Sequence, residues 1–105
     1  MVDTETLKKQ VLEESEKIFP EFKKLKDKIG ENPELGSEEE ESSKLLVEAL
    51  KKHGFEVEYP FFEMHTAFKA VYKGKEPGPV IAILAEYDAL PGVGHGCGHN
   101  IIGTS

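Results

Sequence analysis

The chain has 105 residues, of which 38% are hydrophobic and 31% charged, and its formal net charge is −7. Such a chain makes one small globular domain, and its negative charge argues against nucleic acid or an anionic membrane as a partner. Its longest apolar run, residues 80–85, is much shorter than the ~20 residues that span a bilayer. No signal peptide is visible at Met1–Glu5, and one cysteine cannot form an internal disulfide, so we expect a cytoplasmic location.

A long amphipathic helix is predicted from about Thr4 to Ile29, because apolar residues recur there at steps close to 3.6 residues. Pro20 lies inside this pattern and is expected to kink or split the helix near Phe19. Gly30 is expected to end it.

A second helix is predicted to begin at Ser37, which forms a capping-box pattern with Glu40, and to end at Gly54. The acidic run at residues 38–41 is then the solvated first turn of this helix, where the helix dipole favours anions. A metal-binding or partner-binding role for the run is the less favoured alternative.

After the second helix the pattern becomes that of β-strands. Apolar residues alternate with polar ones at residues 55–59 and again at 68–72, and residues 80–85 are continuously apolar. The continuous run predicts a central strand covered on both faces. We therefore expect an α/β fold in which two N-terminal helices pack on a mixed sheet, with the first turn of a further helix at residues 101–105. Because ligand sites favour the carboxyl ends of strands in such sheets, the loop after residue 85 is the expected functional site.

The glycine-rich loop contains a cysteine and a histidine two residues apart, Cys97 and His99, with carboxylates nearby. Thiolate and imidazole are ligands of zinc and similar metals, and alternating glycines let the backbone fold tightly around them. The residues alone leave two alternatives open, namely a tight turn with a small buried cysteine, or a cysteine nucleophile with His95 or His99 as its base. Neither a complete dinucleotide-binding fingerprint nor a phosphate-binding loop is present.

Longer motifs carry a resemblance to a known family. They are Glu-Tyr-Asp-Ala-Leu-Pro at residues 86–91, Gly-His-Gly-Cys-Gly-His-Asn at 94–100, and Asn-Pro-Glu-Leu-Gly-Ser-Glu-Glu at 32–39. In these motifs the chain strongly resembles the co-catalytic metal amidohydrolases, which include aminoacylase-like, indole-acetyl-amino-acid and aminobenzoyl-glutamate hydrolases and related dipeptidases. Tyr87 stands where many relatives have Met, and Glu86 and Asn100 stand where they have Asp. These choices resemble the aminobenzoyl-glutamate hydrolase and dipeptidase branch.

The resemblance implies a role for each of four residues. Cys97 and His99 would be metal ligands, Asp88 would support the site by orienting a ligand histidine, and His95 would pack or hydrogen bond within the loop. The complete enzyme would hold two ions, Zn²⁺ or Mn²⁺, that activate a water. It would cleave the amide bond of N-acyl amino acids, aminobenzoyl-glutamate-like compounds or dipeptides, with a glutamate as general base.

The resemblance also implies that residues 1–105 are the N-terminal portion of a zinc-peptidase-like catalytic domain. The general-base glutamate, the remaining ligands and a lid domain that commonly mediates dimerisation would lie downstream. We therefore expect this chain to be inactive alone and able to self-associate. The alternative, from another class of function, is a free-standing, non-catalytic metal-binding or interaction domain.

Overall fold

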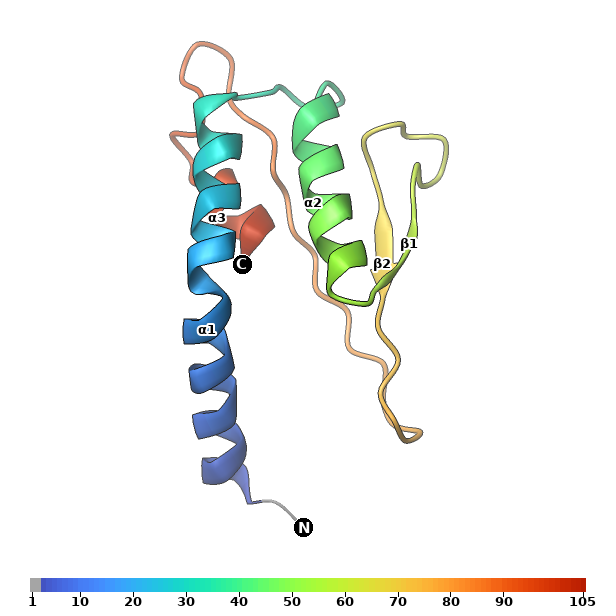
Figure 1. Cartoon of the computed structure of the whole chain (residues 1–105). Coiled ribbons are helices and arrows are strands. Elements are labelled where there is room, and N and C mark those ends of the chain that lie inside the picture. Colours follow the sequence, from blue (N-terminus) through green and yellow to red (C-terminus); the bar gives the residue numbers. More distant parts are fainter. Residues whose placement is uncertain (1–2) are drawn as a thin grey trace.

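The computed structural model describes residues 3–105, so Met1 and Val2, on which part of the signal-peptide expectation rests, lie outside the described residues. The elements are, in chain order, α1 (Thr4–Glu31), α2 (Glu40–Lys52), β1 (Glu56–Glu58), β2 (Lys69–Val71) and α3 (His99–Thr104). Figure 1 shows α1 and α2 side by side, with the hairpin of β1 and β2 beyond α2. The fold is a small mixture of α and β structure.

Within residues 3–105, no helix combines the length and the apolar character that crossing a membrane requires.

Helix α1 runs without interruption through Pro20, so the expected split near Phe19 is wrong. A proline removes only one N–H donor from the helix, and the turns on either side remain helical. The helix also continues past Gly30 to Glu31. Gly30 serves a packing purpose there, because a Cβ at this position would lie 2.9 Å from Asn100 Nδ2 of α3. The glycine therefore allows α3 to approach α1 closely.

The hydrophobic core is small and sits between the C-terminal half of α1 and helix α2. Its buried members are Leu25, Ile29 and Leu46, and partly buried side chains pack around them: Phe22, Leu45, Ala49, Phe68 and Tyr87. The apolar residues of the N-terminal half of α1 are exposed instead, including Val11 at 64%. Figure 1 shows this half of α1 extending beyond the other elements.

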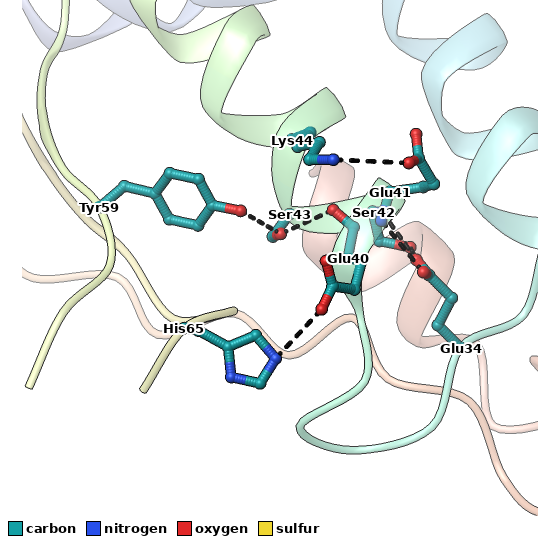
Figure 2. Close-up of polar contacts among 8 residues, drawn as sticks. All are labelled: Glu34, Glu40, Glu41, Ser42, Ser43, Lys44, Tyr59 and His65. Carbon is teal, nitrogen blue, oxygen red and sulfur yellow. Dashed lines mark hydrogen bonds and ion pairs between the residues drawn. The ribbon is translucent and has the colours of Figure 1, made fainter. Parts of the chain in front are cut away.

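Helix α2 begins at Glu40, three residues after the predicted cap, and Ser37 adopts a positive φ of 66°. The capping box at Ser37 is therefore wrong. A different acidic residue, Glu34, pairs with the free N–H groups in the first turn of the helix. Its carboxylate accepts hydrogen bonds from Glu41 N at 3.0 Å, Ser42 N at 2.7 Å and Ser42 Oγ at 2.6 Å (Figure 2). Side-chain acceptors at these backbone positions are what an N-cap normally provides.

The C-terminal end of α2 follows the prediction. Gly54 has φ 90° and donates from its N–H to the Lys51 carbonyl, while Phe55 N donates to the Leu50 carbonyl. This pair of bonds is the Schellman motif, for which glycine is the favoured residue. The motif turns the chain directly into β1.

Strands β1 and β2 confirm the two alternating segments, with shorter bounds than predicted. They pair antiparallel, with Val57 opposite Ala70. Ser43 at the start of α2 is fully buried and hydrogen bonds to the Tyr59 hydroxyl at 2.7 Å, and Figure 2 shows this contact joining the helix to the chain after β1. The sheet is thus two-stranded and antiparallel rather than the mixed sheet we expected.

The central strand predicted at residues 80–85 is wrong for this structure. Val80, Ile81, Ile83 and Leu84 are between 83% and 96% exposed, and the segment has no regular secondary structure. Within residues 3–105, its backbone makes no hydrogen bond to another backbone group. A strand requires a ladder partner, so the apolar segment remains uncovered, and Figure 1 draws it as an irregular trace.

We predict that Glu34→Ala lowers the free energy of unfolding by about 1–2 kcal/mol, the usual effect of losing an N-terminal cap. Desolvation would raise the pKa of the Glu34 carboxyl, but hydrogen bonds from Ser42 and from the backbone of Glu41 hold it below its ordinary value. The stabilisation is therefore present above the unfolded-state pKa and is lost as the pH falls through the lowered folded-state value. Urea unfolding followed by circular dichroism measures the difference. Glu48→Ala on the exposed face of α2 is the control, and equal effects of the two substitutions would contradict the capping role.

We also predict that the chain self-associates through residues 80–84, since exposed apolar segments without strand partners pair with other chains. Ile83→Lys should reduce the concentration-dependent increase in sedimentation coefficient. Gly78→Lys is the matched control, because it adds the same charge where a new side chain would meet nothing within 4 Å. A wild-type chain that remains monomeric at all concentrations would refute this prediction.

Candidate metal centre

The chain enters the site at residues 86–90, and backbone contacts with the Pro-Glu-Leu segment before α2 hold it there. Ala89 N donates to the Glu34 carbonyl at 2.6 Å, and Leu35 and Ala89 form a parallel bridge. Ala89 is buried. Two of the motifs that carry the resemblance, at residues 32–39 and 86–91, are therefore in direct contact although they are about fifty residues apart in sequence.

Side chains alternate along this extended segment, as they do in a strand. Tyr87 points to the hairpin, where its hydroxyl donates to the Thr66 carbonyl and its ring stacks on Phe68 with centroids 6.0 Å apart. Burial, followed by the nearby Glu39 carboxylate, raises the pKa of Tyr87 far above its ordinary value. The neutral Tyr87 thus anchors the segment and leaves Glu86 and Asp88 to project away from the hairpin.

Helix α3 brings the histidine to these carboxylates. His99 is its first residue, after Gly98 in the left-handed conformation with φ 83°. A Cβ at Gly103 would lie 2.8 Å from Tyr87 Cβ and 3.2 Å from the Glu86 carbonyl oxygen. The absence of a side chain at Gly103 therefore lets α3 pack directly against the backbone that carries Glu86.

The imidazole of His99 lies between two carboxylates. Its Nδ1 is 2.8 Å from Asp88 Oδ1 and 3.1 Å from the Asp88 carbonyl oxygen, while its Nε2 is 3.1 Å from Glu86 Oε2. The His99 side chain is 20% exposed, that of Asp88 38% and that of Glu86 76%. One face of the group is therefore supported by the protein, and the Glu86 face is open to solvent.

The hydrogen bond to Asp88 raises the pKa of His99, with further contributions from the charges of Asp88 and Glu86, and outweighs the effect of desolvation. Asp88 also accepts from the Nδ1–H and so fixes which ring nitrogen carries the proton when the ring is neutral. Nε2 is then the nitrogen that can bind a ligand, which is the arrangement that supporting carboxylates give to metal-binding histidines.

The structure brings Asp88 and His99 into direct contact. Cys97 is exposed and is not one of the residues whose ligand atoms converge here. His95 is partly buried, and within the described residues both of its ring nitrogens are buried without a hydrogen-bond partner. The ligand role of Cys97 and the supporting role of His95 remain predictions.

Sequence reasoning missed Glu86 as a member of the group. The signal that could have found it is the Glu-x-Asp spacing, which puts both carboxylates on one side of an extended chain. It also missed that the segment before α2 borders the site. A Cβ at Gly36 would lie 3.8 Å from both Asp88 Oδ2 and Glu39 Oε1, and Glu39 is buried and accepts from Thr66 Oγ1 at 2.9 Å.

The ligand types in this group suit a divalent metal ion, with Glu86 at the Nε2 edge of the imidazole and Asp88 at the Nδ1 edge. One ligand atom from each of Glu86, Asp88 and His99 lies within 4.8 Å of the other two. Imidazole nitrogen and carboxylate oxygen are ligands of Zn²⁺ and Mn²⁺. The donor set is therefore chemically suited to the ions that the sequence resemblance implies.

Comparison with known proteins agrees with this chemistry. No protein-family model matches the chain. A thermostable carboxypeptidase of Saccharolobus solfataricus is 37% identical over 106 residues, which cover 81% of this chain and 27% of that protein. One of the subunits of the p-aminobenzoyl-glutamate hydrolase of Escherichia coli is 38% identical over 77% of this chain and 20% of its own length. An IAA-amino acid hydrolase of Arabidopsis thaliana is 35% identical over 93% of this chain and 25% of its own length.

The chain thus spans about a quarter or less of the length of these relatives, while most of its own length is matched. The matched proteins are peptidases and hydrolases of amide-linked amino acids by their names. With the motifs at residues 32–39, 86–91 and 94–100 present in order, the chain belongs to the family of metal-dependent amidohydrolases and peptidases, and it matches one part of their length.

Proposed function

We propose that this chain supplies part of the metal centre of an amidohydrolase that cleaves N-acyl amino acids, aminobenzoyl-glutamate-like compounds or dipeptides. The observation that carries the proposal is the Asp88–His99 contact of 2.8 Å, which joins the motif at residues 86–91 to the motif at residues 94–100. The names of the matched relatives support the substrate class, because they include a p-aminobenzoyl-glutamate hydrolase, an Xaa-Arg dipeptidase and an N-acetylcysteine deacetylase.

In this proposal each residue has a defined task. His99 binds the metal through Nε2, and Asp88 holds the ring by accepting from Nδ1. Cys97 is the second ligand and lies on the glycine-rich loop only two residues away in sequence. A bound metal ion would lower the pKa of a water and polarise the amide carbonyl. In this proposal the described residues bind the metal and orient the ligand histidine. Proton transfer also requires a general base, and residues 87–105 contain no glutamate that could serve as one.

One observation favours a second function. The exposed apolar residues at 80–84 form a surface that a further polypeptide segment could cover. A free-standing interaction domain would use this surface and would not require metal. Metal binding by the isolated chain therefore distinguishes the two functions.

We predict that Asp88→Asn lowers the pKa of His99, because the substitution removes the charge and the acceptor that raise it. In the wild type, His99 contributes stability that is fully present below its unfolded-state pKa and is lost as the pH rises through its higher folded-state pKa. Proton NMR titration of the His99 ring measures its pKa. Unfolding at several pH values measures how the free energy of unfolding depends on that pKa. Asp27→Asn, on the exposed surface of α1 beside Lys23, is the control; a similar decrease in that variant would contradict the role of Asp88.

For the function itself, we predict that the chain binds zinc but does not hydrolyse amides. Equilibrium dialysis should show zinc bound by the wild type and lost in His99→Ala. A panel of N-acyl amino acids and dipeptides, assayed with zinc or manganese, should show no turnover above metal salt alone, because a general base is needed as well as the metal.

Two results would count against this function. Zinc binding that is equal in the wild type and in His99→Ala would remove His99 from the site. Turnover that Cys97→Ser and His99→Ala both abolish would show that the chain, alone or as an oligomer, completes the catalytic machinery that we place elsewhere.

A further inference from the structure

We propose that Glu86 is a metal ligand in this chain and binds the ion together with Nε2 of His99. This inference rests on the proposed function, which places the metal at His99, and it adds a ligand that the motif comparison did not assign. Asp88 then acts only on the opposite side of the ring, where it holds Nδ1.

The distances within the group support this division of roles. Asp88 Oδ1 lies 2.8 Å from Nδ1 and Glu86 Oε2 lies 3.1 Å from Nε2, so the two carboxylates occupy opposite edges of one imidazole. Two ligand atoms bound tetrahedrally to one zinc ion at ~2.0–2.1 Å lie about 3.3 Å from each other. The observed separation of Nε2 and Oε2 is close to that value, so binding an ion between them requires only a small movement of Glu86.

The position of Glu86 is set by its backbone, although its side chain is exposed. Tyr87, the next residue, is anchored to the hairpin through Thr66, and Gly103 of α3 packs against the Glu86 carbonyl oxygen. The Glu86 side chain can therefore move without displacing the segment. An exposed carboxylate on a fixed backbone can exchange a contact with the imidazole for a contact with an ion.

Glu86 also places a ligand atom in the group that includes His99, whereas Cys97 is exposed and is not a member of that group. Zinc sites usually take three or four protein ligands. The alternative explanation of the Glu86 contact is an ion pair with a protonated His99, in which Glu86 has no part in metal binding. The two explanations differ in how metal affinity responds when the Glu86 charge is removed.

The test is a titration of the full chain with Co²⁺, followed by its visible absorption, with zinc competition to obtain the affinity. Glu86→Gln keeps the size of the side chain and should weaken metal binding by at least about tenfold, because loss of a supporting or ligating group has effects of that order. Glu76→Gln removes the same charge at an exposed position outside the site and should bind as the wild type does. Circular dichroism of each variant verifies folding.

The outcomes separate the two proposals. If His99→Ala loses the metal and Glu86→Gln binds like the wild type, the Glu86 proposal is overturned and the proposed function stands. If the wild type binds no metal, both are overturned. A cobalt–thiolate charge-transfer band that disappears in Cys97→Ser would show that Cys97 joins the ion as well; the role of Glu86 would still be decided by the affinity of Glu86→Gln.

Discussion

Glu34 connects the two halves of this chain, and the geometry of the site depends on it. Its side chain accepts hydrogen bonds from the first turn of α2, and its carbonyl accepts one from Ala89. One residue therefore determines both where α2 begins and where the segment carrying Glu86 and Asp88 lies. Because the carboxylate uses backbone donors that would otherwise be unpaired at a helix start, the arrangement needs no large core to support it.

Other acidic side chains also gather around this end of α2, each with its own partner. Glu39 is buried against Thr66, and Glu40 pairs with His65 at 3.2 Å on the surface, as Figure 2 shows for the second pair. Each of these carboxylates has a hydrogen-bond donor beside it, which is the condition for keeping a charged group near a protein interior. Glu40 and Glu41 lie in the first turn of α2, as the sequence predicted. The prediction is wrong for the start of the run, because the helix begins only at Glu40 and the N-cap residue Glu39 is buried rather than solvated.

The features that the sequence predicted well are those determined by near neighbours. The end of α2 depends on Gly54 and the turn around it, and the hairpin depends on alternation over a few residues. The start of α2 could not be read locally, because its cap comes from Glu34 and displaces the capping box that Ser37 and Glu40 suggest. Residues 80–85 show the opposite case: their apolar pattern predicts a buried strand, but burial requires strand partners that residues 3–105 do not provide. A residue pattern reports what a segment can do, whereas its neighbours decide whether it does so.

The candidate metal centre also depends on contacts between segments that are far apart in the sequence. The Asp88–His99 contact forms because α3 can approach residues 86–87 through Gly103 and α1 through Gly30. Cys97, by contrast, is an exposed residue of the glycine-rich loop. The described contacts thus hold Glu86, Asp88 and His99 in place. These contacts involve Glu34, Tyr87, Gly30 and Gly103, and none of them involves the uncovered residues 80–85. For this reason the group around His99 is held in place although, within residues 3–105, the longest apolar segment pairs with no strand.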